Sequence, residues 1–254
     1  MRLIDTHCHL YYEEKLGDPH AAIQRALEAG VDRMICIGTN AETSRSALAF
    51  ADQYDGIYAV VGWHPTEAAS FTEAGLAEIR ELAAHPKVVA IGEIGFDFYW
   101  DYATPAEQEV CFAAQYELAQ QLGKPLVYHC REAYPHMLAR LESLPRHPGL
   151  FHCFGGDSSE AVRALELGCW FGVDGPLTYP KNIELRDLFA SLPRDRVVIE
   201  TDAPFLAPQK FRGKPNEPAY VAHVNAKLAE VWGVSEEECA QITTANAERY
   251  FGLS

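Results

Sequence analysis

The sequence predicts an α/β fold, a single (β/α)8 TIM-type barrel, from three observations. Strand-like apolar runs alternate with helical segments along the whole chain, which indicates a parallel sheet. The chain has 254 residues, close to the size of one such barrel. Seven side chains that can bind metal fall at the expected C-terminal ends of strands, and barrels of this class build their active sites there.

Eight segments are predicted as strands, and several are near-continuous runs of Val, Ile and Leu. Such runs are typical of parallel strands that are buried on both faces. The expected strands are residues 3–6, 33–37, 57–62, 88–92, 125–128, 149–151, 169–173 and 197–201.

Capping signals mark the start of four of the expected helices, at Asp18, Thr104, Asp157 and Ser235. The expected helices are residues 19–30, 42–53, 73–84, 105–122, 132–144, 158–167, 183–191, 218–232 and 236–249. An open doubly wound sheet is the alternative, but no glycine-rich phosphate loop follows the first strand. No linker or repeat interrupts the pattern, so we expect one domain over residues 1–254.

Composition and charge favour a soluble cytoplasmic protein. Hydrophobic residues make up 48% of the chain, and no apolar run is long enough to cross a membrane. The N-terminus turns polar at Asp5 without the apolar stretch of a signal peptide. The net charge of −15 disfavours non-specific binding of nucleic acid through a broad basic surface. A phosphate substrate stays open, because bound divalent cations invert the local field. No obligate protein partner is evident.

Cysteine usage argues against a disulfide framework or a zinc ribbon. The chain has seven cysteines and no Cys-x-x-Cys motif. Cys8, Cys130 and Cys153 each follow a histidine in an expected strand. Alternation along a strand points them to the opposite face, so we interpret them as core residues.

The metal-capable side chains form the main functional signal. They are His7, His9, His64, Glu93, His129, His152 and Asp202. His7 and His9 are two residues apart, so both imidazoles share one strand face and can reach one ion. Glu93 is expected to close an apolar strand, where a carboxylate is costly unless it is paired or bound to metal. Asp202 can bind metal and accept a proton from an activated water.

Simpler interpretations exist for each of these residues. A histidine can be a packed core residue, Glu93 a salt-bridged structural carboxylate, and Asp202 a turn residue before Pro204. His64 is expected to contact substrate or support a ligand, because the other six suffice for two metals. Arg131, Lys214 and Asn216 are further candidates for substrate contacts, with surface or loop positions as the competing interpretation.

Six motifs occur in an order that resembles the TatD family of metal-dependent hydrolases and deoxyribonucleases, in the amidohydrolase superfamily. They are Asp-Thr-His-Cys-His, Gly-Trp-His-Pro, Gly-Glu-Ile-Gly-Phe-Asp, Tyr-His-Cys-Arg-Glu-Ala, His-Cys-Phe-Gly-Gly and Glu-Thr-Asp-Ala-Pro-Phe. The resemblance covers essentially the whole chain. It implies a two-metal site in which His7, His9 and Asp202 hold one ion and His129 and His152 the other. Glu93 would bridge the two ions.

The sequence differs from the family pattern mainly around and after Asp97. Phe96 stands where leucine is common, and Phe98, Tyr99 and Trp100 form an unusually aromatic stretch. The cofactors implied are two divalent ions, Mg²⁺, Mn²⁺ or Zn²⁺. The four histidines also suit Fe²⁺ or Ni²⁺.

The leading hypothesis is a deoxyribonuclease that trims single-stranded DNA, or another phosphodiester, from the 3′ end with a metal-activated water. Asp202 and Glu93 would be the catalytic residues. The alternative is a metal-dependent ester, lactone or amide hydrolase, such as an aminoacyl-tRNA deacylase. A catalytically idle barrel that serves as a binding module is the third hypothesis, and the complete ligand set argues against it.

Overall fold

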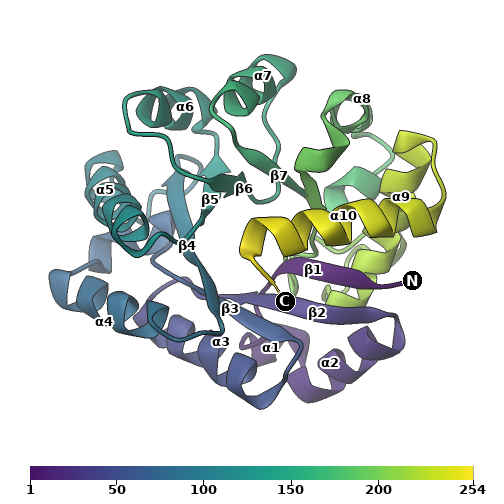
Figure 1. Cartoon of the computed structure of the whole chain (residues 1–254), viewed down its shortest axis with the longest axis horizontal. Helices are drawn as coiled ribbons and strands as arrows, with labels where there is room; N and C mark the ends of the chain where they lie inside the picture. Colours follow the sequence, from purple (N-terminus) through teal and green to yellow (C-terminus); the bar gives the residue numbers. More distant parts are fainter. Residues whose placement is uncertain (254) are drawn as a thin grey trace. The chain divides into compact units, whose positions relative to one another are not determined.

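The computed structural model describes residues 1–253, which form eight strands that alternate with helices (Figure 1). The strands lie in one sheet in the order β1 to β8. They are β1 (Leu3–Cys8), β2 (Val31–Ile37), β3 (Ile57–Val61), β4 (Val88–Asp97), β5 (Leu126–Arg131), β6 (Gly149–Phe151), β7 (Trp170–Val173) and β8 (Val197–Ile199). This sequential parallel order is that of the predicted (β/α)8 fold class.

Ten α-helices occupy the connections and the C-terminal segment of the described chain. They are α1 (Glu13–Leu16), α2 (Pro19–Glu28), α3 (Ala41–Gln53), α4 (Glu73–Ala83), α5 (Pro105–Leu122), α6 (Tyr134–Glu142), α7 (Ser158–Glu166), α8 (Ile183–Ser191), α9 (Val221–Trp232) and α10 (Glu236–Phe251). Five short 3-10 segments add to them: Pro65–Ser70, Gly175–Thr178, Arg194–Arg196, Gln209–Phe211 and Pro218–Tyr220. None of the helices described is both long and apolar enough to cross a membrane.

The chain divides into two compact units. The first contains Met1–Cys36, Tyr54–Ile57 and the described residues from Phe171 onward. In it, β1 pairs in parallel with β2, and β7 with β8. The segment after β8 also meets β1 here, through a parallel bridge between Cys8 and Ala203. Helix α10 packs against both β1 and β8.

The second unit contains Ile37–Gln53 and Tyr58–Trp170. Its strands pair in parallel in the order β3, β4, β5, β6. Helix α3 precedes β3, and helices α4 to α7 follow the four strands in turn. The prediction of a single domain over residues 1–254 stays a prediction.

The four predicted capping residues are confirmed. Thr104 and Glu107 form a complete capping box, as do Asp157 and Glu160. Asp18 and Ser235 each accept a backbone N–H with their side chains. The short helix α1 was not predicted, because four residues are too few to show a helical period. The helix expected from Pro218 begins at Val221, after a 3-10 turn.

Two expectations about the strands need correction. Glu93 does not close β4, because pairing with β5 continues from Gly95 opposite His129 to Asp97 opposite Arg131. His129 likewise lies inside β5. Cys8 and Cys130 are buried as predicted, but Cys153 is half-buried and lies in a turn after β6.

Replacing Thr104 with alanine is expected to destabilise the protein by about 1 kcal/mol, because the N3 backbone N–H of α5 loses its cap. Urea unfolding measures this change. Ser46→Ala is the control, since that hydroxyl bonds only the carbonyl of Glu42 one turn earlier in its helix. Equal stability of the two variants would contradict the capping role of Thr104.

Candidate active site

The first unit brings His7, His9 and Asp202 together into a ligand group. His7 lies within β1, His9 follows it, and Asp202 lies three residues past the end of β8. The Nε2 atoms of His7 and His9 are 3.3 Å apart. The Oδ1 atom of Asp202 lies 3.7 Å from the first and 3.3 Å from the second. Two neutral ligands and one anionic ligand therefore converge on one point.

This group fits a divalent cation. Its three side chains are buried, and their ligand atoms all lie within 4.8 Å of one another. A tetrahedral ion with ligands at about 2.0–2.1 Å separates them by roughly 3.3 Å, close to the observed spacing. The Nδ1 atom of His9 lies 3.0 Å from the hydroxyl of Tyr11, which fixes the orientation of the ring.

Asp5 holds the segment that carries Asp202. Its Oδ2 atom accepts the hydroxyl of Thr201 at 2.6 Å, and its Oδ1 atom accepts the Thr201 N–H at 2.9 Å. The N–H of Asp202 in turn donates to the carbonyl of His7 at 2.8 Å. Burial raises the pKa of Asp5 well above its ordinary value, against the effect of these hydrogen bonds. Asp202 has a φ of 56°, a conformation that aspartate adopts more readily than most residues.

Asn216 has a structural role, and its assignment as a substrate contact stays a prediction. Its side chain is fully buried, and the amide nitrogen donates to the carbonyls of Thr201 and Phe205, both at 2.7 Å. It therefore fastens the loop on which Asp202 lies. Lys214 is exposed in the same loop, and its role in substrate binding stays a prediction.

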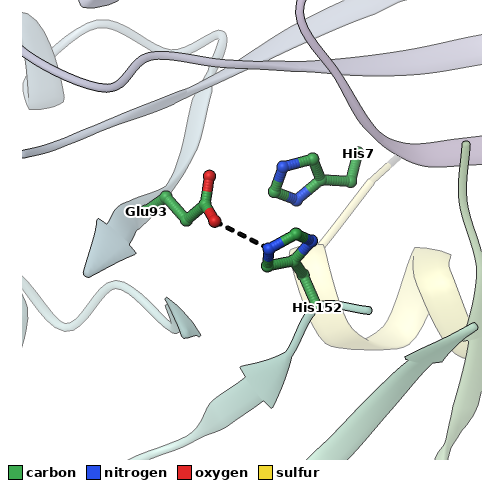
Figure 2. Close-up of side chains that lie close together, drawn as sticks. All are labelled: His7, Glu93 and His152. Atoms are coloured by element: carbon green, nitrogen blue, oxygen red, sulfur yellow. Dashed lines mark ion pairs between the residues drawn. The ribbon is translucent and has the colours of Figure 1, made fainter. Parts of the chain in front are cut away.

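The second unit gathers Glu93, His129 and His152. The Oε1 atom of Glu93 lies 2.7 Å from Nε2 of His152, an ion pair drawn in Figure 2, and 2.9 Å from Nδ1 of His129. The two histidine nitrogens are 3.4 Å apart. Glu93 and His152 are buried. The chemistry of this set, two imidazoles and one carboxylate, also suits a divalent cation.

Asp97 supports this second group, and it is a residue that the sequence analysis did not assign a role. Its Oδ2 atom lies 2.8 Å from Nε2 of His129, while Nδ1 of the same ring faces Glu93. A carboxylate behind a ligand histidine fixes the ring and makes it a stronger ligand. Asp97 ends β4 opposite Arg131, two residues past His129. An acidic residue at a strand end is the sequence signal that could have identified Asp97. This signal was missed because β4 was predicted to end at residue 92.

His64 also lies against Glu93, with its Nε2 atom 3.6 Å from Oε1. Its Nδ1 atom accepts the backbone N–H of Thr66 at 3.1 Å, so a neutral ring carries its proton on Nε2. Burial and the neighbouring His129 lower the pKa of His64 to about 3, which keeps the ring neutral. Although its position would permit a metal ligand, this tautomer makes His64 a hydrogen-bond donor.

The net charge of the second group depends on whether His129 is protonated. Burial disfavours its charged form, but hydrogen bonds to Asp97 and Glu93 outweigh burial and raise the pKa of His129. Burial acts to raise the pKa of Asp97, but its hydrogen bond and charge attraction to His129, together with the backbone N–H of Trp100, lower this pKa overall. A proton on Nδ1 of His129 and a metal ion therefore compete for the same lone pair.

The whole chain matches known proteins of one family. The model of TatD-related DNases matches residues 4–252. The chain belongs to this family. It is 39% identical to a protein named an uncharacterised metal-dependent hydrolase, YabD, of Bacillus subtilis, over 99% of this chain and 100% of the relative. It is also 39% identical to a protein named the 3′-5′ ssDNA/RNA exonuclease TatD of Klebsiella pneumoniae, over 93% and 92%.

A solved structure supports the same conclusion for the TatD fold. The crystal structure of YJJV, a TatD homologue from Escherichia coli K12, matches with a TM-score of 0.93 and 35% identity, covering 100% of this chain and 99% of that one. The predicted TIM-type barrel class and the TatD resemblance are thus confirmed. This chain is a metal-dependent hydrolase of the TatD type, with His, Glu and Asp groups placed for metal binding.

Asp97→Asn is expected to weaken metal binding by the second group about 10- to 100-fold, because His129 loses its carboxylate partner. Isothermal titration with Mn²⁺ or Zn²⁺ after chelation measures the affinity of each site. Asp101→Asn is the matched control, since Asp101 is exposed four residues later. Unchanged affinity in Asp97→Asn would show that Asp97 does not support a ligand.

In the chelated protein, His129 is expected to titrate above the ordinary histidine pKa of about 6.5. Its ion pair then contributes stability below the unfolded pKa, and this contribution is lost as pH rises through the raised folded pKa. NMR titration of the labelled ring measures the value. A midpoint at or below that of a free histidine would refute the stabilising role of Asp97 and Glu93.

Proposed function

We propose that this protein is a 3′-5′ exonuclease that hydrolyses phosphodiester bonds of single-stranded DNA or RNA with two divalent cations. The observation that carries the proposal is the pair of ligand groups, each with two imidazoles and a carboxylate. The relatives named as ssDNA/RNA exonucleases support the choice of substrate. The ions we propose are Mg²⁺, Mn²⁺ or Zn²⁺, one at each group.

The ligand roles divide between the two groups. His7, His9 and Asp202 would hold one cation, and Glu93, His129 and His152 the other. Bound divalent cations polarise the phosphate and lower the pKa of an attacking water toward neutrality. The role of Glu93 as a bridge between two ions stays a prediction.

The protein's own residues would supply the proton transfers and the orientation. The carboxylate of Asp202 would accept the proton of the attacking water, since it lies in the ligand group beside His9. His64 would donate its Nε2 proton in a hydrogen bond to a phosphate oxygen, because its Nδ1 atom is already an acceptor. Arg131, exposed two residues past His129, offers a positive charge for the phosphate backbone.

A carbonyl ester is the competing substrate. The same ligand chemistry activates water for attack on an ester, lactone or amide, including an aminoacyl-tRNA ester. The net charge of −15 favours a substrate with few phosphate contacts. An enzyme that trims ends needs only a few such contacts, so the charge is compatible with both substrates.

The proposed activity predicts stepwise shortening of a 5′-labelled single-stranded DNA oligomer from its 3′ end, only after divalent metal is returned to chelated protein. Glu93→Ala should lower the rate at least about 100-fold, because two histidines of the second group lose their anionic partner. Glu166→Ala, an exposed carboxylate at the end of α7, is the matched control.

Cleavage of an aminoacyl ester but of no oligonucleotide would replace the proposal by the ester hydrolase. Two bound metals without hydrolysis of any ester would favour an idle binding module. Equal rates for wild type and Glu93→Ala would indicate a contaminating nuclease or a wrong role for Glu93.

A further inference from the structure

The exposed aromatic side chains gather in one short segment. Among residues 1–253, the aromatic side chains that are exposed are Phe98, Tyr99, Trp100 and Tyr102, from 37% to 62%. The other three tryptophans, Trp63, Trp170 and Trp232, are each 8% exposed or less. Exposing aromatic surface to water is unfavourable. Its concentration within five consecutive residues therefore indicates a surface that binds another molecule.

Two rings of this segment are stacked on one another, and Tyr99 stands edge-on to Trp100 at an interplanar angle of 87°. Trp100 and Tyr102 lie nearly parallel, with an interplanar angle of 13° and centroids 5.4 Å apart. The guanidinium of Arg131 lies 3.8 Å from the centroid of Tyr99 and 5.8 Å from that of Trp100. We call Tyr99, Trp100, Tyr102 and Arg131 the aromatic platform. Flat rings beside a cation match a nucleotide, which combines a planar base with an anionic phosphate.

The platform is fastened directly to the second ligand group. The Oδ1 atom of Asp97 accepts the backbone N–H groups of Tyr99 and Trp100, both at 3.0 Å. The other oxygen of the same carboxylate bonds His129 at 2.8 Å. Arg131 lies two residues past His129 on β5, and its carbonyl accepts the N–H of Phe98 at 2.9 Å. The rings therefore stand next to the residues proposed to hold a metal ion.

We propose that the aromatic platform stacks an unpaired base of the substrate, next to the phosphate that is cleaved. This inference rests on the proposed exonuclease function and specifies its substrate as nucleic acid with unstacked bases. A paired base is already stacked in a duplex and cannot cover these rings. Trp63 is not part of the platform, because its indole is buried under Gly75 and donates to the carbonyl of Glu67.

Binding without catalysis tests the platform first. Because Trp100 is the exposed tryptophan, we expect its fluorescence to be quenched when single-stranded oligothymidylate is added to chelated protein. Trp100→Phe should abolish the quenching but keep most of the affinity. Tyr99→Ala combined with Trp100→Ala should weaken binding about tenfold or more, as expected for loss of base stacking. Wild-type protein should bind a duplex of the same sequence as weakly as the double variant binds the single strand.

Tyr58→Ala is the matched control. Tyr58 also carries a cation over its ring, Lys87 at 4.9 Å, but lies at the start of β3 in the same unit. Equal weakening by Tyr58→Ala, or unchanged binding in the platform double variant, would overturn the proposal. Far-ultraviolet circular dichroism of each variant separates loss of the platform from loss of folding.

Kinetics then test whether the stacked group is a base. With metal present, an oligomer whose last three nucleotides are abasic should show a KM about tenfold or more above that of the intact oligomer. The platform double variant should raise KM for the intact oligomer and leave the abasic KM unchanged. Independent, additive effects of the two changes would refute stacking of a base.

The two proposals fail in different ways. If the metal-free protein binds the oligonucleotide with quenching but cleaves no oligonucleotide when metal is returned, the exonuclease proposal is refuted. The platform then remains a nucleic-acid contact. If neither the platform variants nor the abasic sites change the KM for cleavage, the exonuclease proposal stands and the platform proposal is refuted. An aromatic patch that serves a protein partner would give that second result.

Discussion

The cost of burying carboxylates is the constraint on which the functional part of this structure depends. Six acidic side chains are buried among the described residues: Asp5, Glu93, Asp97, Asp174, Glu200 and Asp202. A buried charge is tolerated when donors or cations surround it. Asp5 is surrounded by N–H and O–H donors from its own unit. Glu93 and Asp202 instead face histidines, whose ring nitrogens accept either a proton or a metal ion.

This difference separates structural carboxylates from functional ones. The oxygens of Asp5 are engaged by Thr201 and the backbone of His7, so the residue positions the chain and does not bind metal. Asp97 combines the two roles, with one oxygen on backbone amides and the other on His129. The raised pKa of His129 lets this ring supply compensating charge when a cation is absent, which links the stability of the protein to pH and to metal.

The sequence predicts features that depend on local patterns, and it does less well with features that depend on strand register. The capping boxes at Thr104 and Asp157 are local and are confirmed. The predicted end of β4 at Gly92 was wrong, because pairing with β5 continues from Gly95 to Asp97. The role of Asn216 follows from contacts with Thr201 and Phe205 across a loop, which no periodicity reveals. The candidate ligand residues were recognisable because their types and order match one family.

The anchoring of the aromatic segment has a consequence for divergence within the family. Asp97 grips positions 99 and 100 through their backbone N–H groups, which every residue except proline provides. The side chains at these positions can therefore change without loosening His129. The side chains proposed to contact the substrate, at positions 99 and 100, can thus evolve independently of the residues proposed to bind metal, although Asp97 lies only two residues before position 99. Proline at either position is the one change that this arrangement would resist.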